Sequence, residues 1–351
     1  MAKIRRMFPG GNTYKGSFSY HKYILGKGGK KLYILKGVPG GGKSSLMKDI
    51  ADKMLKRNFS IEYHHCPSDK DSVDGVVIKE LNVAIVDGTF PHIIDPVYPG
   101  LYEKIINIGE FACEEKLLPY KDEIVKAKVN NKNCYRRTYA YFRGAKEIRE
   151  EIESTNREKT DLAKVYKYIE KLEKKLFENV EPSTRLGMDR HLFSSAYTPE
   201  GYIDFTDTLL TDVDEVYYIA GEIGTGKSIL LDSIFEKSLR KGLNVEVYHN
   251  PLMPKEIDTL IIPKLGTAIS ASVICKDKYT EMIDFSKYMK NSKRIDEDYE
   301  MYEELISIGL SSLKKAKNNH ELLEEYYHTA IDYGKIDEVK RKIISEILSL
   351  T

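Results

Sequence analysis

The chain has 351 residues, long enough for two ordinary domains, and its apolar content of 41% and charged content of 31% are those of a soluble globular protein. The net charge of +1 neither indicates nor rules out a nucleic-acid partner, and no apolar run approaches the roughly 20 residues of a membrane span. Four cysteines without a C-x-x-C pair, and an N-terminus without an apolar signal core, make us expect a cytoplasmic protein with free thiols.

The first informative stretch is an apolar strand, Leu32–Leu35, followed by the pattern G-x-x-x-x-G-K-S and a helical run over 44–57. This order is typical of a P-loop, in which backbone N–H groups and a helix N-terminus surround the phosphates of a nucleotide. Lys43 is expected to reach the β- and γ-phosphates and take part in catalysis, and the Ser44 hydroxyl to bind Mg²⁺. The predicted nucleotide-binding residues here are Gly37, Gly40, Gly41, Gly42, Lys43, Ser44 and Ser45.

Three further strands are predicted in this half of the chain, over 60–64, 76–78 and 83–86. The last of them runs into Asp87-Gly88, which is the Walker B pattern of an apolar strand that ends in an acid. We therefore predict that Asp87 is a catalytic residue that holds the Mg²⁺ side of the site. The structural alternative for Asp87 is a turn at the end of a strand.

The segment that begins at Asp87, DGTFPHIIDPVYPG, contains three prolines, which restrict its backbone and favour a shaped loop at the edge of a site. His92 in this loop is predicted to act as an acid or base or to contact phosphate. The alternative is a loop histidine with a structural hydrogen bond. The stretch 102–179 then reads as helical, with breaks near Pro119 and over 130–133, and forms either a solvated helical hairpin or a partner-binding arm.

The chain is internally repeated. A second glycine-rich loop, GEIGTGKS, follows the strand Val216–Ile219, and the residues around the two loops match at one constant spacing from Gly37 to about Ile85, with roughly a third of them identical. The match extends upstream, where MFPGGNTYKG corresponds to LFSSAYTPEG. Two units are therefore predicted, residues 1–182 and 183–351. The nucleotide-binding residues of the second are Gly221, Gly224, Thr225, Gly226, Lys227 and Ser228, with Ser228 as a Mg²⁺ ligand.

The second unit differs at the place of the acid. Its strands are predicted over 244–248, 260–262 and 268–269, and Ala271 aligns with Asp87. Asp258, Asp277 and Asp284 are candidates to replace that acid, and the second site is expected to bind nucleotide with slow hydrolysis or none. The loop 88–100 has no counterpart, and three helices are predicted over 298–317, 321–333 and 336–350.

Some polar residues are matched across the repeat. His65 and His249 end equivalent strands, which suggests a role in the site or a structural cap. Glu62 and Glu246 are weak candidates for positioning an attacking water, and Arg5 and Arg190 for contacting a γ-phosphate, with structural roles as the alternatives.

These units predict an α/β fold of two tandem P-loop NTPase units, each a mostly parallel sheet flanked by helices and followed by a helical segment. The segments GVPGGGKSS, GEIGTGKS, MFPGGNT, DGTFPHIIDP and RHLFSSAYTPEG resemble those of a bacterial family of tandem P-loop ATPases, over nearly the whole chain. That resemblance implies ATP binding and two P-loop domains, and it implies no particular reaction. GVPGGGKSS and DGTFPH are also similar to segments of nucleoside monophosphate kinases, although Thr89 is an insertion and His92 stands where those kinases have arginine.

The function expected from the sequence is ATP binding with Mg²⁺ and hydrolysis at the first site, acting on an unknown protein or small-molecule client. The absence of an N-K-x-D motif favours ATP over GTP. A phosphotransferase that acts on a small molecule or nucleotide is the first alternative. A nucleotide-dependent adaptor without turnover is the second.

Overall fold

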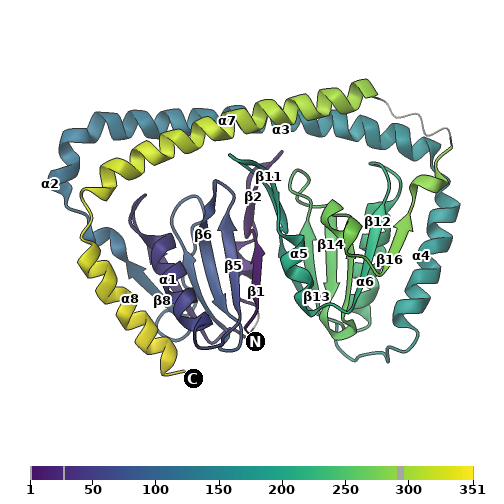
Figure 1. The fold of residues 1–351 in the computed structure, drawn as a ribbon, viewed down its shortest axis with the longest axis horizontal. Helices are drawn as coiled ribbons and strands as arrows, with labels where there is room; N and C mark the ends of the chain where they lie inside the picture. Colours follow the sequence, from purple (N-terminus) through teal and green to yellow (C-terminus); the bar gives the residue numbers. More distant parts are fainter. Residues whose placement is uncertain (1, 27, 291–295, 351) are drawn as a thin grey trace.

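The computed structural model describes residues 2–26, 28–290 and 296–350, and places two six-stranded sheets side by side beneath a pair of long helices (Figure 1). The first sheet has the order β8-β4-β7-β6-β5-β1, and all its strands but β6 run in the same direction. Its strands are β1 (Ile4–Met7), β4 (Lys31–Lys36), β5 (Ile61–Cys66), β6 (Asp69–Ile78), β7 (Val83–Asp87) and β8 (Glu103–Asn107). Strand β6 is reversed because the turn after Cys66 is far too short for the crossover that a parallel pair requires.

The second sheet repeats this arrangement, with the order β16-β12-β15-β14-β13-β9 and with β14 as the reversed strand. Its strands are β9 (Asp189–Leu192), β12 (Glu215–Ala220), β13 (Val245–His249), β14 (Ile257–Ile262), β15 (Thr267–Ser270) and β16 (Glu281–Asp284). The α/β class is confirmed, with sheets that are mixed rather than wholly parallel, and the sequence repeat is a repeat of topology.

The two sheets approach each other through their edge strands β1 and β9 (Figure 1). Just beyond these strands, Phe8 and Phe193 exchange backbone hydrogen bonds of 2.8 and 3.0 Å. The hairpins β2 (Gly10–Thr13) with β3 (Gly16–Ser19), and β10 (Ser195–Thr198) with β11 (Gly201–Asp204), follow at equivalent places. The matched segments upstream of the glycine loops therefore form the centre of the molecule, where the two halves meet.

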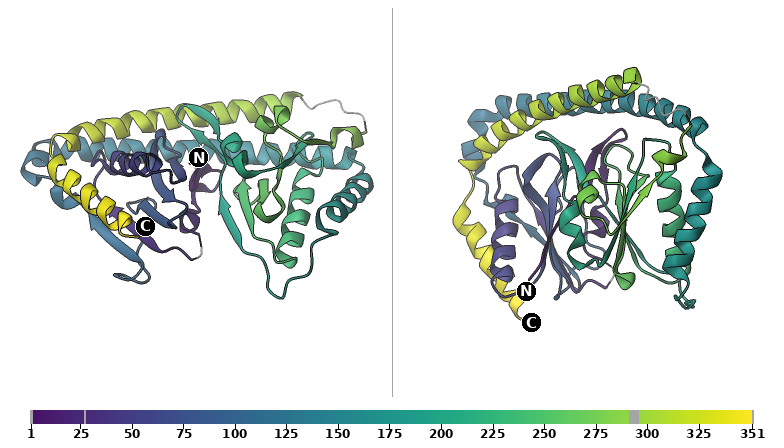
Figure 2. Two further views of the ribbon diagram at one scale, coloured as in Figure 1. Left: turned by 60° about the horizontal axis from the view of Figure 1, so that its bottom comes forward. Right: turned by 45° about the vertical axis from the view of Figure 1, so that its right-hand side comes forward.

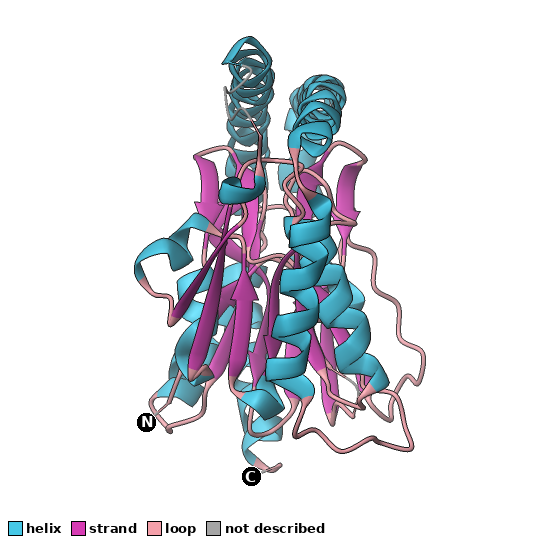
Figure 3. Cartoon of the chain, turned by 90° about the vertical axis from the view of Figure 1, so that its right-hand side faces the viewer, coloured by secondary structure: helices cyan, strands magenta, loops and turns pink. Residues whose placement is uncertain are grey.

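Two long helices lie side by side across both sheets, as the views in Figures 2 and 3 show. They are α3 (Lys121–Lys159) and α7 (Asp296–His328), and we call this pair the arch. The helical prediction over 102–179 is wrong at its start, where Glu103–Asn107 form strand β8. The expected helix break near Pro119 is present, but the breaks expected over 130–133 and between 317 and 321 are wrong, because both helices continue through them. Packing of one helix on the other overrides the weak helix propensity of the asparagines there; the Asn131 side chain, for example, donates to Ala316 O at 3.3 Å.

The shorter helices complete each layer. Helices α1 (Lys43–Leu55) and α6 (Lys227–Arg240) follow the two glycine loops and pack on their own sheets. Helices α2 (Glu114–Leu117) and α5 (Thr206–Leu209) are single turns. In the parts of the chain that the structure describes, no helix combines the length and the apolar character needed to cross a membrane.

The last helix of each repeat packs on the sheet of the other repeat. Helix α4 (Leu162–Phe177) buries Val165, Ile169 and Leu172 in the core of the second sheet, whereas α8 (Tyr333–Leu348) buries its isoleucines in the core of the first (Figure 1). Equivalent backbone hydrogen bonds hold both connections: Asp161 N to Tyr288 O at 2.9 Å, and Asp332 N to Phe111 O at 3.0 Å. The predicted boundary between residues 182 and 183 falls between α4 and β9. Each sheet is therefore covered by a helix from the other side of that boundary.

The arch is packed closely enough to test by substitution. A Cβ added to Gly309 would lie 2.5 Å from Cε1 of the fully buried Phe142. We expect Gly309→Ala to lower the free energy of unfolding by about 1–3 kcal/mol, as overpacked core substitutions do. Gly144→Ala is the matched control, because its Cβ would meet Leu305 at 3.4 Å and alanine favours a helix by up to about 1 kcal/mol over glycine. Urea unfolding that ranks the two variants equally would contradict this packing.

Candidate functional site

The first glycine loop (residues 37–45) connects the carboxyl end of β4 to α1. Gly40 and Gly42 adopt left-handed backbone angles, with φ of 62° and 74°, which L side chains rarely adopt, and Gly42 caps the helix. Lys43 is the first residue of α1, and its Nζ donates to Val38 O at 2.9 Å. The lysine side chain thus folds back over the loop that carries it.

The second glycine loop (residues 221–228) has the same form between β12 and α6. Gly221, Gly224 and Gly226 have φ of 141°, 85° and 102°, and the Nζ of Lys227 donates to Gly221 O at 2.7 Å. The buried Thr225 hydroxyl donates to Glu222 O at 2.8 Å, within the loop. Both lysines therefore fold back on the loops that carry them.

The predicted serine ligands lie at the start of the helices. The Ser44 hydroxyl accepts a hydrogen bond of 3.1 Å from the backbone N–H of Val73. Ser228 has the equivalent position in the second half and is half-buried, whereas Ser45 is exposed.

Asp87 lies beside Lys43. It ends β7, which pairs in parallel with β4, and Leu35 is its partner in register. The Oδ2 of Asp87 is 3.6 Å from the Nζ of Lys43, and the backbone N–H of Thr89 donates to Oδ1 at 2.8 Å. The structure thus brings together the lysine and the acid that the sequence singled out, at the carboxyl ends of neighbouring strands.

In the second half the charge beside the lysine comes from a different strand. Asp258 is the second residue of β14, and burial raises its pKa to about 6, although the positive charge of Lys227 opposes that rise. Burial in turn lowers the pKa of Lys227, and Asp258 opposes that shift. Of the three acids proposed to replace the missing one, Asp258 interacts with the loop lysine, whereas Asp284 accepts from Ser286 N at 2.9 Å and Asp277 lies in a 3-10 turn.

Each glycine loop is covered by helices from the other half of the chain, which the sequence did not reveal. A Cβ on Gly40 would lie 3.0 Å from the backbone oxygen of Glu324 in α7, and the Tyr333 hydroxyl donates to Gly40 O at 3.0 Å. Hydrogen bonds from the His320 side chain and from the Gly40 N–H lower the pKa of Glu324. The first loop is therefore held against α7 and against Tyr333, the first residue of α8.

The second loop is covered by α3 in the same way. The side chain of Asn156 donates to Ile223 O at 2.9 Å, and a Cβ on Gly224 would lie 2.5 Å from Glu153 O. One turn earlier on α3, Arg149 donates to both carboxylate oxygens of Glu256, at 2.8 and 2.5 Å. Arg149 also affects the pKa of Lys227, so α3 brings a positive charge near the second loop.

The matched arginines and glutamates lie at the centre of the molecule, away from the glycine loops. Arg5 donates to Glu62 and to Glu246 at 3.0 Å each, and Arg190 donates to Glu62 at 2.7 Å. Glu62 is fully buried near the amino end of β5, the opposite end of the sheet from the loops. The proposed roles in orienting water or contacting a γ-phosphate are thus replaced by one structural role, an ion-pair cluster between the halves.

The matched histidines are engaged on both ring nitrogens. His65 is hydrogen-bonded to Lys70 O at 2.8 Å and to the Arg6 guanidinium at 2.9 Å. His249 is hydrogen-bonded to Glu256 O at 3.2 Å and to His191 at 2.8 Å. Burial lowers the pKa of His65 to about 4 and that of His249 to about 3. These contacts support the structural alternative for both.

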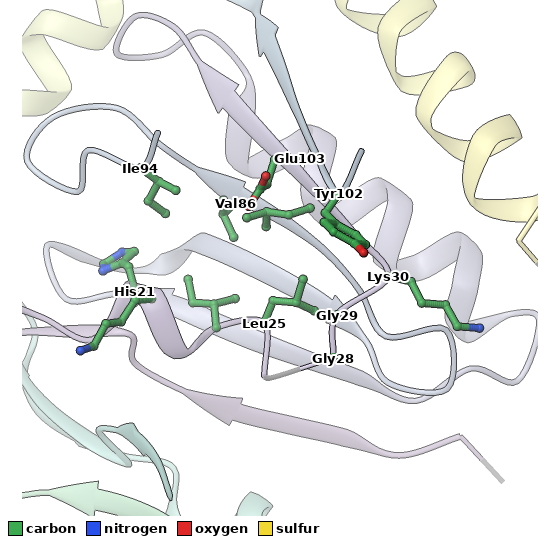
Figure 4. A pocket seen from close by; sticks show the side chains of 12 residues that line it. His21, Leu25, Gly28, Gly29, Lys30, Val86, Ile94, Tyr102 and Glu103 are labelled. Atoms are coloured by element: carbon green, nitrogen blue, oxygen red, sulfur yellow. The ribbon is translucent and has the colours of Figure 1, made fainter. Parts of the chain in front are cut away.

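His92 packs on a histidine that the sequence did not single out. Its ring lies 3.9 Å from that of His21, centroid to centroid, and its Nε2 is 3.7 Å from the Oδ2 of Asp74. His21 also lines a cavity of about 670 Å³ in the first half (Figure 4). Ile24, Leu25, Val86 and Ile94 form apolar parts of its wall, and Lys30, Tyr102 and Glu103 also line it. The repeat offered one signal for this group, since Asp74 and Asp258 match across it.

Comparisons of the chain with protein-family models, with curated proteins and with solved structures gave no match.

Proposed function

We propose that this protein binds ATP with Mg²⁺ at the first glycine loop and hydrolyses it there, and that the second loop binds nucleotide with slow turnover or none. The observation that carries the proposal is the pair of Lys43 and Asp87, 3.6 Å apart at the carboxyl ends of adjacent parallel strands. Ligands of open α/β sheets bind at that edge. In the second half Ala271 aligns with Asp87, which motivates the asymmetry.

The residues present fit the two ligands. Gly42 caps α1, so the N-terminus of that helix, which favours anionic phosphate oxygens, lies at the loop. A hydroxyl from Ser44 and a carboxylate from Asp87 are oxygen ligands of the kind that Mg²⁺ takes. Bound Mg²⁺ would neutralise charge on the β- and γ-phosphates. On binding, Lys43 would exchange Val38 O for phosphate, and Ser44 would give up its bond with Val73 N.

The arch links the two loops. The first loop contacts Glu324 and Tyr333 from the second half, and the second loop contacts Glu153 and Asn156 from the first half. A phosphate at either loop would compete with these contacts. We therefore propose that nucleotide binding and hydrolysis shift the arch, and that a protein or small-molecule client responds to that shift, at a cytoplasmic location.

Separate lysine variants test this proposal. We expect Lys43→Ala to lower ATP hydrolysis by about 10²-fold, because it removes a positive charge from the phosphates that react. We expect Lys227→Ala to leave most hydrolysis intact and to remove one bound nucleotide per chain. Phosphate release measures the first effect and equilibrium dialysis the second. Lys48→Ala is the control, since Lys48 lies on α1 and donates to Asp71 O at 2.9 Å.

The outcomes separate the proposal from its alternatives. Equal loss of hydrolysis in both lysine variants would contradict the asymmetry between the sites. Phosphate transfer only on addition of an acceptor, with a phosphorylated product, would indicate a phosphotransferase. Binding without any turnover would indicate a nucleotide-dependent adaptor.

A further inference from the structure

Two histidines and an aspartate converge in the first half of the chain. His21 comes from the 3-10 turn His21–Tyr23, Asp74 from β6, and His92 from the loop after β7. The Oδ2 of Asp74 is 3.5 Å from the Nε2 of His21 and 3.7 Å from the Nε2 of His92. One ligand atom from each of the three lies within 4.8 Å of the others. Side chains from three separate segments thus meet at one point.

Polar atoms buried in this group make no hydrogen bond. Among the described residues, His21 Nε2 and Asp74 Oδ2, which face each other, are buried side-chain atoms without a hydrogen bond. The Nδ1 of His92 is also buried without one, whereas its Nε2 is the nitrogen 3.7 Å from Asp74. His21 and Asp74 are only 5% and 6% exposed, so bulk water does not replace those bonds. A buried polar atom left unsatisfied is costly, and two such atoms that face each other beside a second imidazole point to a shared ligand.

The histidines are prepared to act as ligands. The Nδ1 of His21 is hydrogen-bonded to the Ser19 hydroxyl at 2.8 Å, which orients the ring and leaves Nε2 directed at Asp74. The ring of His92 is stacked on that of His21, with the centroids 3.9 Å apart, so both imidazoles lie beside the carboxylate. The imidazoles of His21 and His92 therefore face the carboxylate of Asp74.

The repeat shows that the fold does not need this group. Asp258 occupies the equivalent place in the second half, and its neighbour there is the amide of Asn250, with Nδ2 at 3.4 Å from Oδ1. The segment equivalent to His21 carries Phe205 and Thr206, and the loop of His92 has no counterpart. The same sheet is thus built twice and carries the histidines once, which favours a ligand over a packing role.

We propose that His21, Asp74 and His92 bind one divalent transition-metal ion of the Zn²⁺ or Co²⁺ class. Two imidazoles and one carboxylate suit such ions, whereas Mg²⁺ prefers oxygen ligands alone. Three protein ligands leave a coordination position open, as in catalytic rather than structural zinc sites. The ion would reach the site through the cavity that His21 lines (Figure 4). The three side chains differ from the proposed Mg²⁺ ligands Ser44 and Asp87, although Asp87 is near enough to His92 for its charge to act on that ring. The proposal does not rest on the proposed function.

Metal titration of the full chain tests this site without any enzyme assay. After treatment with a chelator and dialysis, Co²⁺ is added in the presence of excess Mg²⁺ and without nucleotide. We expect one Co²⁺ per chain, with the visible absorption of a bound ion, and its displacement by Zn²⁺. His92→Asn and Asp74→Asn should each weaken binding at least about 10–100-fold, the loss typical of changes at a metal site.

Asp258→Asn is the matched control, because it changes the equivalent acid of the second half and should leave Co²⁺ binding unchanged. Circular dichroism shows whether each variant is folded. His92→Asn changes a loop residue and decides the question if Asp74→Asn does not fold. The proposal is overturned if no saturable Co²⁺ binding occurs, or if folded His92→Asn binds Co²⁺ as tightly as the unchanged chain.

Discussion

Residues 1–182, produced without the rest of the chain, should not fold as a monomer. The core of the first sheet is closed by α8, which belongs to the second half, whereas the first half's own α4 lies on the second sheet. The fragment would expose the face that α8 covers and the apolar face of α4. Residues 183–351 alone should fail for the equivalent reason.

The size of the lost contact supports this expectation. Helix α8 buries four isoleucines in the first core, each 7% exposed or less, namely Ile336, Ile343, Ile344 and Ile347. Burial of such side chains stabilises by about 1.5–3 kcal/mol each, or about 6–12 kcal/mol together. That is as large as the whole stability of a typical domain, about 5–15 kcal/mol. Solubility, near-ultraviolet circular dichroism and analytical ultracentrifugation of each fragment measure the outcome.

Co-expression of the two fragments is the control, since the same peptide bond is missing but all helices are present. We expect the pair to form a soluble one-to-one complex. A fragment that associates with a second copy of itself could exchange α4 or α8 between copies, which agrees with the prediction. A fragment that is folded and monomeric would contradict the exchange of helices.

Glu62→Ala should cause the largest loss of stability of any single substitution considered for this chain, about 3–5 kcal/mol. The Glu62 carboxylate is fully buried and accepts from Arg5 at 3.0 Å and from Arg190 at 2.7 and 3.2 Å. Its removal leaves two guanidinium groups with fewer counter-charges inside the interface between the halves. Glu246 lies in the same cluster and can compensate only in part, because it already pairs with Arg5. Urea unfolding measures the change.

Lys79→Ala is the control, because it removes an exposed charge that pairs with the same carboxylate. Its Nζ is 3.1 Å from the Oε1 of Glu62, but its side chain is 41% exposed, so we expect a cost of at most about 1 kcal/mol. A loss for Glu62→Ala as small as for Lys79→Ala would show that the cluster contributes little to stability.

The same cluster predicts a dependence on pH. Burial would raise the pKa of Glu62, but Arg190, His64, Lys79 and Arg5 together hold it well below its usual value. Because the pKa is lower in the folded state, this stabilisation is complete above the unfolded pKa and is lost as the pH falls toward the folded one. The unmodified chain should therefore lose stability as the pH falls below about 4.5, and Glu62→Gln should show a shallower decline.

Sequence pattern predicted those elements well whose conformation is set by residues close by in the chain. The glycine loops, the strands before them and the helices after them all lie close to their predicted bounds. Their periodicity and turn chemistry act within a few residues. Helix ends were less predictable. The asparagines near 130 and 318 suggested helix ends, but contact between α3 and α7 keeps both helices continuous there.

The sequence by itself determined the duplication, the pairing of Lys43 with Asp87 along adjacent strands, and the absence of an acid at Ala271. These follow from short spacings and from comparison of the chain with itself. Only the tertiary structure decided which sheet each last helix covers, because the apolar faces of α4 and α8 are chemically alike and either could seal either core. It alone joined His21, Asp74 and His92, since three segments far apart in sequence meet only when the sheet and its loop are folded.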